Sequence, residues 1–290
     1  MTAIAVFSAM VAVWTAAPAV VQQSWQPPEP TIGPETAIPR NRPRVVITES
    51  APFAKQGGKW VEGKRVAVRK TTYSPQGIVT DDEKFLPSGA LVSKTVCTLD
   101  EFGRVVEKTI FETPAQKLTG RESYRYDNRG SLTEVQRSRG DGTRINTSVF
   151  EYNDRGKPTR ETITPDGGGA PWIVAYVYDQ NGRPTTITCT GPDGKQVWKH
   201  AYQYDDNGRC TEDRAWRHGS LASNTRYTYD AKGDLAKLVV YRGDGTLAIR
   251  HTFRSTYDAK GNWTKRTTYD TRFFKPRWVE VSYRVITYYP

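Results

Sequence analysis

Few residues of this 290-residue sequence stand at spacings that support catalysis or metal binding. The three histidines, His200, His218 and His251, lie far apart and have no cysteine or carboxylate at a ligand spacing, so we expect them on strands or at the surface. The sequence contains no zinc-protease, serine-hydrolase, Walker or dinucleotide-binding motif. It therefore predicts a protein that is not an enzyme and that binds no cofactor.

Aspartates precede glycines in two recurring patterns, and both indicate turns. In D-x-x-G, the Asp begins a type I turn and accepts backbone N–H groups, while the Gly at the fourth position tolerates a positive φ. A D-G pair follows about half a period later and is typical of a two-residue hairpin. Asp205 and Asp206 would also offer oxygen ligands to Ca²⁺. Because the turn already accounts for these aspartates, we expect no metal site.

R-G-D occurs twice, as Arg139-Gly140-Asp141 and Arg242-Gly243-Asp244. Both copies lie within R-G-D-G-T on the second turn of a unit, where turn chemistry accounts for the Gly and the Asp. We therefore expect these residues to shape turns rather than to bind an adhesion receptor. Aromatic and arginine rows could stack sugars or bases, but aromatics that recur in every unit are needed first as core.

Tyrosines mark a repeat with a period of about 26 residues. Six segments share one frame, from YRYDNRG to STYDAKG, and two degenerate units centred on Leu99 and Tyr73 precede them. The structural residues of the six clear units are Tyr126, Asp127, Gly130, Tyr152, Gly156, Tyr178, Asp179, Gly182, Tyr204, Asp205, Gly208, Tyr229, Asp230, Gly233, Tyr257, Asp258 and Gly261. Successive centres are 25 to 28 residues apart, which makes eight units in all.

Each unit has an apolar end and a wetter middle. The residue six positions after the central tyrosine is apolar in all eight units, and the residue eight positions after it is polar. Turn signals alternate every 10–14 residues without helical periodicity, which predicts an up-and-down antiparallel meander of about sixteen strands. Because open sheets beyond about ten strands curl or split, we expect an all-β array of hairpin repeats that coils as an open sheet or solenoid over residues 46–290.

The last segment, Trp278–Thr287, alternates strictly between two kinds of residue. Val279, Val281, Tyr283 and Val285 lie on one face, and Glu280, Ser282 and Arg284 lie on the other. Such alternation predicts a terminal strand whose polar face is exposed to solvent.

The N-terminal region is not part of the array. Residues 1–19 carry no charged side chain and end in an A-x-A site, which predicts a secretory signal peptide; the apolar run of about 20 residues would also suit an uncleaved anchor. Residues 20–45 are rich in proline and predict an extended linker. We therefore expect the protein to be secreted or to lie in the periplasm or cell envelope.

The net charge of +11 and the pI of about 9.5 favour anionic partners, such as acidic polysaccharides or lipids. The basic residues are spread along the chain without a dense run, so they also serve to solvate an extended sheet. We expect no specific nucleic-acid binding.

The three cysteines do not predict a disulfide framework. Cys189 and Cys210 fall on strands with another strand between them, so their Cα atoms lie about twice the ~4.8 Å strand spacing apart, beyond disulfide reach. Cys97 is left over in any pairing.

The repeat frame itself is similar to a known one. Y-x-Y-D-x-x-G-R, as in YDQNGR (Tyr178–Arg183) and YDDNGR (Tyr204–Arg209), followed by a D-G turn, resembles the YD repeat of Rhs and teneurin-type proteins. The resemblance is good over Tyr124–Tyr269 and weaker over Thr71–Arg121. In that family, long arrays wrap into β-shells around a C-terminal toxin or act as binding modules on cell surfaces.

This chain departs from that pattern in length and content. It is shorter, its period is longer, and it contains neither a D-P-x-G-L autoproteolysis motif nor a toxin domain, so it resembles the small exported YD-repeat proteins of bacteria. We predict a non-catalytic binding or structural module whose surface contacts a polysaccharide, an anionic polymer or a protein. Two alternatives remain: a cargo-holding component of a polymorphic-toxin system, and an unrecognised hydrolase with carboxylates converging in a cleft.

Overall fold

The computed structural model describes residues 32, 39–113 and 116–290. The signal peptide or anchor predicted for residues 1–19 and most of the linker predicted for residues 20–45 lie outside the described residues. The described part is all β, as the turn spacing predicts. None of its segments forms a helix long and apolar enough to cross a membrane.

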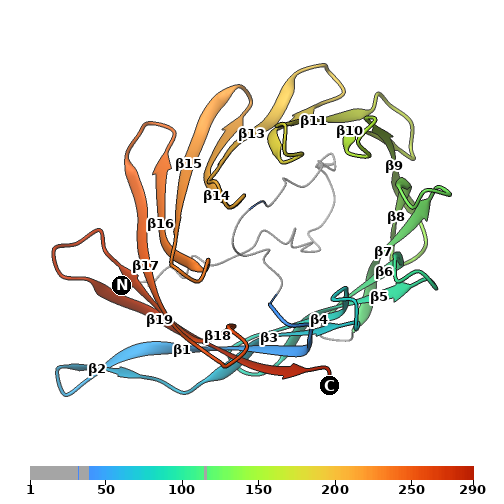
Figure 1. Ribbon diagram of the computed structural model, residues 1–290. Helices are drawn as coiled ribbons and strands as arrows, with labels where there is room; N and C mark the ends of the chain where they lie inside the picture. The colour runs from blue at the N-terminus through green and yellow to red at the C-terminus, as the bar shows by residue number, and fades with distance from the viewer. Residues whose placement is uncertain (1–31, 33–38, 114–115) are drawn as a thin grey trace, which may run out of the picture.

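Nineteen strands follow one another along the described residues, and from β3 to β19 each pairs antiparallel with the next strand in the chain (Figure 1). They are β1 (Pro43–Gln56), β2 (Lys59–Glu62), β3 (Val66–Tyr73), β4 (Val79–Phe85), β5 (Leu91–Leu99), β6 (Val105–Glu112), β7 (Lys117–Tyr126), β8 (Leu132–Arg139), β9 (Arg144–Tyr152), β10 (Pro158–Pro165), β11 (Trp172–Tyr178), β12 (Pro184–Thr190), β13 (Gln196–Tyr204), β14 (Cys210–Arg217), β15 (Ser220–Tyr229), β16 (Leu235–Arg242), β17 (Leu247–Tyr257), β18 (Trp263–Asp270) and β19 (Arg277–Tyr288).

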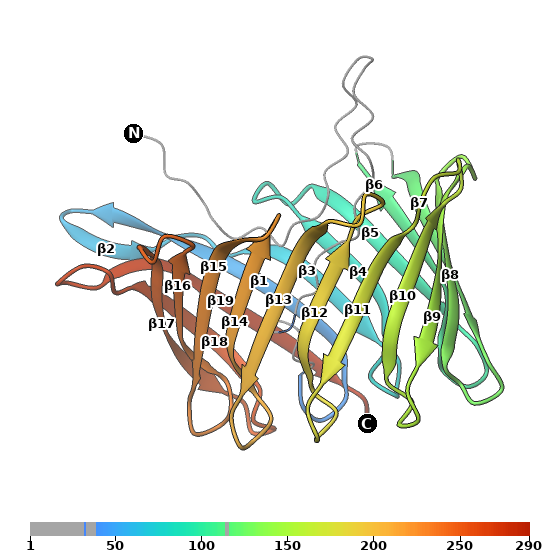
Figure 2. The ribbon, with the colours of Figure 1, turned by 90° about the horizontal axis from the view of Figure 1, so that it is seen from above.

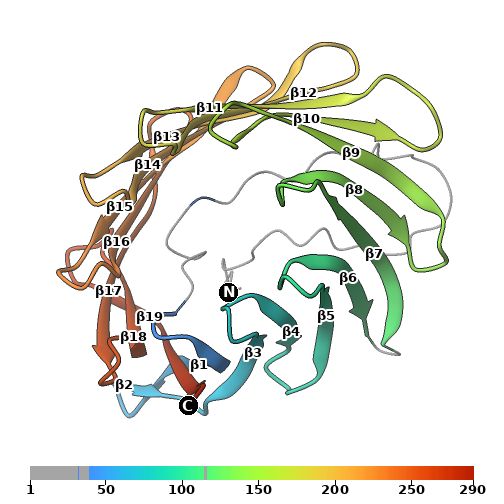
Figure 3. The same ribbon diagram turned by 45° about the vertical axis from the view of Figure 1, so that its right-hand side comes forward.

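The sheet closes on itself, so the predicted open sheet or solenoid-like array is wrong. Strand β1 pairs on one side with β3 and on the other with β19; Val46, for example, stands opposite both Thr71 and Ile286. Strand β2 pairs only with the second half of β1, and the other eighteen strands form a closed barrel (Figures 1 and 3).

The physical reason for closure lies in β1, which has no repeat motif. Each end of the eight-unit array presents a strand with one unpaired edge, and an unpaired edge exposes a row of backbone N–H and C=O groups. Strand β1 hydrogen-bonds to both edges at once. Closure therefore removes both free edges, and the array does not need to coil as an open sheet.

The two faces of the wall differ in burial. Trp198 stands opposite Cys189, which stands opposite Val174, so all three share one face, and all three are buried. Val177 and Val149 lie on the other face and are 56% and 49% exposed. Because side chains converge on the concave side of a closed sheet, the buried face is the inner face.

One type of turn occurs at both rims. At the D-x-x-G rim, Gly130 N donates to Asp127 O (3.0 Å) and Asp127 N to Ser131 O (2.9 Å); at the opposite rim, Gly142 N donates to Arg139 O (3.0 Å). Of the loop residues 140–142, Gly142 alone has a positive φ (88°), whereas a two-residue hairpin would require one at Asp141 as well. This D-G pair therefore does not form the two-residue hairpin that the sequence suggests. Figure 2 shows the alternating turns along the two rims.

A two-residue turn does occur at His218-Gly219, where φ is 46° and 83°. It joins Arg217 directly to Ser220, which stand opposite each other. The shorter loop accounts for the one unit with a step of 25 residues, between Tyr204 and Tyr229.

The R-G-D segments are turns whose glycines are set by close packing. A Cβ added at Gly140 would lie 1.8 Å from Leu118 O, and one at Gly243 would lie 1.8 Å from Leu221 O. Asp141 accepts a hydrogen bond from Thr143 N (2.9 Å). The neighbouring backbone and the turn therefore account for these residues.

The alternation of β19 has the opposite orientation to the one expected. Val281 and Tyr283 are buried on the outer face against Ala51 and Phe53, next to the β1–β2 hairpin. Arg284 stands on the inner face, so its side of the strand does not face bulk solvent as a free terminal strand would. The strand is not terminal in the sheet, because β1 covers its edge.

Candidate functional site on the rim and the inner wall

The aspartate of each D-x-x-G turn is engaged by its own turn. Asp179 Oδ1 accepts hydrogen bonds from Asn181 N and Arg183 N, both at 2.9 Å, while Oδ2 pairs with Arg183 Nε at 2.7 Å. The bond from the Arg183 backbone and the contact with its guanidinium lower the pKa of Asp179 despite some desolvation. Asp100, Asp127, Asn153, Asp205, Asp230 and Asp258 accept backbone bonds in the same way.

Asp205 and Asp206, the two candidate metal ligands, do not come together with other ligands. Asp205 pairs with Arg209 Nε at 2.7 Å, and Asp206 is exposed on the same turn. Among the residues that the structure describes, no three His, Cys, Asp or Glu side chains form a group that could hold a metal ion.

The central tyrosine of each unit ties that unit to the one before it. Its hydroxyl donates to the carbonyl at the start of the strand after the previous D-x-x-G turn. The bonds run from Tyr126 to Val105 (2.8 Å), Tyr152 to Leu132 (2.6 Å), Tyr178 to Pro158 (2.7 Å), Tyr204 to Pro184 (2.7 Å) and Tyr229 to Cys210 (2.6 Å). These tyrosines therefore form a hydrogen-bonded ladder along the rim.

The ladder changes form near the chain end and then crosses the closure. Tyr257 donates to Asp230 Oδ2 and Tyr288 to Asp258 Oδ2, both at 2.5 Å. Tyr289 donates to Tyr73 O (2.6 Å), so the last strand contacts the first repeat unit. Tyr288 acts as a ninth central tyrosine, which the sequence analysis missed because no D-x-x-G turn follows it.

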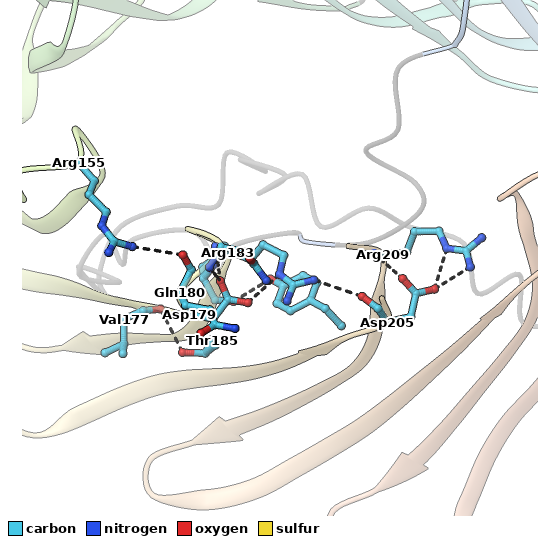
Figure 4. Close-up of polar contacts among 11 residues, drawn as sticks. Arg155, Val177, Asp179, Gln180, Arg183, Thr185, Asp205 and Arg209 are labelled. Carbon is cyan, nitrogen blue, oxygen red and sulfur yellow. Dashed lines mark hydrogen bonds and ion pairs between the residues drawn. The ribbon is translucent and has the colours of Figure 1, made fainter. Parts of the chain in front are cut away.

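Arginines that follow the turn glycine link neighbouring turns (Figure 4). Arg183 holds its own Asp179, donates to Asp205 O (3.2 Å) and lies over the Tyr204 ring, 4.9 Å from its centre. Arg104 and Arg209 lie in the same way over the next tyrosine, at 4.6 and 4.8 Å. Cation–π stacking and the ion pair together fix the spacing between turns.

The last two D-x-x-G turns lack this arginine, as do the turns that end in Ser131 and Lys157, and Arg40 takes its place in the last two from the N-terminal side. Asp234 and Asn262 stand where the arginine would be. Arg40 donates to Lys232 O and to Gly261 O (3.1 Å), and Arg40 N donates to Asn262 Oδ1 (2.7 Å). The segment before β1 therefore completes the rim of the last two units.

One part of the inner face is apolar, and we call it the apolar wall. It consists of Ile163, Trp172, Val174, Ile187, Cys189, Trp198, Tyr202 and Cys210, all at most 6% exposed. Ile32, from the chain before β1, packs against it and so lies inside the barrel. The predicted strand positions of Cys189 and Cys210, on β12 and β14 with β13 between them, are confirmed.

Two of the three histidines lie on the inner face, and none is near another. His200 Nδ1 lies 2.8 Å from Asp213 Oδ1, and its ring is flanked by Trp198 and Tyr202. His251 is buried on β17 opposite Asp270, and burial lowers its pKa. His218 occupies the tight turn.

A second part of the inner face holds paired charges. Arg137 lies 3.6 Å from Glu122 and 3.8 Å from Glu161, and Lys108 lies 3.2 Å from Glu122. Burial opposes the ionisation of Glu122, but Lys108, the Tyr124 hydroxyl and Arg137 outweigh it and lower its pKa. These carboxylates converge, yet each is neutralised by a cation, as in a structural ion network.

A third part carries excess positive charge, and we call it the arginine wall. It consists of Arg266 and Arg284, which lie 4.4 and 3.9 Å from the ring centre of Trp263, and of Arg69, whose charge acts on Arg284. Arg266 pairs with Asp234 (3.7 Å) and Arg69 with Asp82 (2.5 Å). Arg284 Nε is buried without a hydrogen-bond partner, and burial followed by repulsion from Arg266 lowers the pKa of Arg284 to about 10.

The fold and these contacts define a class: a closed β-barrel of tyrosine–aspartate hairpins in which each unit is bonded to the next along one rim. Residues 178–217, which contain two such turns, match the family model described as RHS Repeat. This segment of the chain therefore carries an RHS repeat, and the other hairpins share its turn and its tyrosine–carbonyl bond.

Solved structures resemble the barrel only weakly. A porin-like protein from Bacteroides uniformis has a TM-score of 0.43 and 12% identity, over 84% of this chain and 96% of that one. The TcdB2-TccC3-Cdc42 structure has a TM-score of 0.38 and 18% identity, over 79% of this chain but only 13% of that one. The Photorhabdus luminescens Tc holotoxin pore has values of 0.37 and 17%, with the same coverage. Such weak likenesses carry no functional information about this chain.

No curated protein sequence is significantly similar to this chain.

Two residues, one on the rim and one on the inner face, have no sequence signal of their own. Arg40 lies in the proline-rich segment, where nothing local indicates a contact, and the missing arginine in the last two D-x-x-G turns is no signal on its own, because Ser131 and Lys157 replace it in two earlier turns. Arg284 was placed on the exposed face of an edge strand, and only closure of the sheet moves that face inward.

Proposed function

We propose that this chain is a non-catalytic, exported Rhs-type module that holds an extended polypeptide segment against the inner face of its barrel, at the cell envelope or outside the cell. The observation that carries the proposal is the packing of Ile32 on the apolar wall. Ile32 lies more than ten positions before β1 and belongs to no strand of the described residues, and the contact that the structure shows for it is the burial of its side chain.

The chemistry of the apolar wall favours a polypeptide over a sugar. Carbohydrates stack on aromatic faces that remain open, with polar groups beside them. Trp172 and Trp198 are only 6% and 3% exposed and are covered by aliphatic, aromatic and thiol groups. Such a surface suits the apolar side chain of a peptide.

Closure of the barrel also affects the choice between the predicted binding surface and the cargo-holding alternative. The predicted binding surface assumed an open array, whereas a ring that encloses an apolar face supports the cargo-holding alternative. The hydrolase alternative loses support, because the converging carboxylates Glu122 and Glu161 are engaged by Arg137.

The chain contains its own probes for a test. Cys189 and Cys210 belong to the apolar wall, whereas Cys97 lies on β5, away from it. We propose labelling the full chain with iodoacetamide and following each cysteine by mass spectrometry. In the Ile32→Asp variant, labelling of Cys189 and Cys210 should rise at least about fivefold and that of Cys97 should stay constant, because local opening exposes only the apolar wall.

A peptide with the sequence of residues 26–44 should then restore protection of Cys189 and Cys210 in the Ile32→Asp variant. Ile32→Val serves as the matched control and should label like the unmodified chain. Unchanged labelling in Ile32→Asp, or no effect of the peptide at high concentration, would contradict the proposal.

A further inference from the structure

Two hairpins project from the barrel where it closes. One is β1–β2, with its turn at Gly57-Gly58, and the other joins β18 to β19; both extend beyond the wall on the same side of the barrel (Figures 1 and 2). Phe53 and Trp278 hold them together, with ring centres 4.6 Å apart, and Lys265 on β18 pairs with Glu62 on β2 at 3.3 Å. We call residues 55–65 and 270–279 together the seam tip.

The seam tip exposes large apolar side chains. Phe274 is fully exposed (101%), and Phe273, Trp60, Val61, Trp278 and Val279 are between 37% and 47% exposed. They are carried by two neighbouring hairpins, and large apolar groups exposed in this way mark interaction sites. These side chains lie on projecting hairpins and not in a groove, so they can contact a broad, deformable partner surface.

Basic residues surround these side chains. The seam tip contains Lys55, Lys59, Lys64, Arg65, Arg272, Lys275 and Arg277 against Glu62 and Asp270, which is seven positive and two negative charges, or +5. Both acids are already paired within the protein, Glu62 with Lys265 and Asp270 with Arg272 (2.6 Å). Arg277 lies 3.8 Å from the Phe273 ring centre, so charge and aromatic groups are held together.

We propose that the seam tip docks on an anionic lipid bilayer, with Phe273, Phe274 and Trp60 entering the headgroup region and the lysines and arginines contacting lipid phosphates. Aromatic side chains favour the membrane interface, and each basic residue near an anionic surface contributes about 1 kcal/mol. A second copy of the chain is a poor partner, because a two-fold contact would place +5 against +5. This inference is independent of the proposed function, which concerns the inner face.

The test uses sedimentation of the full chain with vesicles of phosphatidylcholine alone or with about 30% phosphatidylglycerol. We expect binding to the anionic vesicles only, with a blue shift of tryptophan emission. Phe273→Ser/Phe274→Ser and, separately, Lys59→Glu/Lys275→Glu should each weaken binding more than about tenfold. All four side chains are exposed, so the variants should keep the melting temperature of the unmodified chain.

Phe102→Ser is the matched control, because Phe102 is 72% exposed on a D-x-x-G turn at the opposite rim. It should bind vesicles like the unmodified chain. Absence of binding to anionic vesicles, or equal binding by the Phe273→Ser/Phe274→Ser variant, would overturn the proposal. A concentration-dependent dimer that this variant abolishes, without vesicle binding, would instead assign the seam tip to self-association.

Discussion

Trp198 and Trp263 are both buried on the inner face, at 3% and 6% exposure, yet their surroundings are opposite. Trp198 belongs to the apolar wall, which also receives Ile32. Trp263 lies between two guanidinium groups, those of Arg266 and Arg284. The same side chain on the same face is therefore stabilised by apolar packing in one unit and by cation–π contacts in another.

The comparison shows that the inner wall is not a uniform core. Apolar burial is favourable wherever neighbours fill the space, whereas desolvated charges are favourable only if each has a partner. Glu122, Arg137 and Glu161 meet that condition, and Arg284 does not. Mutations in the different walls should therefore change the free energy of unfolding by different amounts and, for Arg284, in the opposite direction.

The largest effect is expected in the apolar wall. Trp198→Ala should lower the free energy of unfolding by about 4 kcal/mol, because it removes a buried aromatic ring and leaves a cavity. Urea unfolding measures the change. Trp216→Ala, on the outer face beneath Lys199, should cost well under half as much; equal losses would mean that the apolar wall is not a core.

The next effect is expected in the ion network. Arg137→Met should cost about 3 kcal/mol at neutral pH, because Glu122 and Glu161 lose a shared cation while remaining partly buried. In the unmodified chain the lowered pKa of Glu122 contributes stability that is present above its ordinary pKa of 4.5 and is lost as the pH falls through the folded value. The penalty of Arg137→Met should therefore shrink below pH 4.5, and a pH-independent penalty would contradict this explanation.

The arginine wall should respond with the opposite sign. Arg284→Met should raise the free energy of unfolding by about 1 kcal/mol, because it replaces a desolvated charge, whose Nε has no hydrogen-bond partner among the described residues, with an apolar chain of similar length. Arg266→Met should lower it, because Asp234 then loses its cation. Paired urea unfolding curves test both, and destabilisation by Arg284→Met would show that its contact with Trp263 outweighs its desolvation.

The smallest effect is expected on the rim. Arg40→Ala should increase amide hydrogen exchange in the turns Asp230–Gly233 and Asp258–Gly261 and cost no more than about 1 kcal/mol, since it removes solvent-exposed hydrogen bonds. The turn Asp179–Gly182, which has its own Arg183, should exchange as before. If Arg40→Ala changes the exchange rate equally in all three turns, or in none of them, the role given to Arg40 is contradicted.

Short-range sequence patterns predict the hairpin repeat but not the closure of the sheet into a barrel. The D-x-x-G turns and the central tyrosines act over fewer than thirty residues, so the order of strands and their antiparallel pairing follow from the sequence. The pairing of β1 with β19 has no local signal, because β1 carries no repeat motif and its partner lies at the other end of the chain. An open array was therefore the natural expectation, and it was wrong.

The same limit applies to the candidate site. The apolar row six positions after each tyrosine could be identified from spacing, since it includes Cys210 and Trp263. Which face becomes the inner one depends on closure, so the environment of Arg284 and the docking of Ile32 could not be derived from alternation alone.

Closure by β1 and β19 has a consequence for the order of synthesis. Ser50 and Glu280 meet across the joint although 230 positions separate them, so the ring cannot close until almost the whole chain has emerged from the ribosome. Contacts between residues so far apart in the sequence form slowly, because the entropy cost of closing the loop comes before the favourable energy of strand pairing. We therefore expect the growing chain to remain an unclosed ribbon, with the edges of its first and last strands accessible, until β19 has been synthesised.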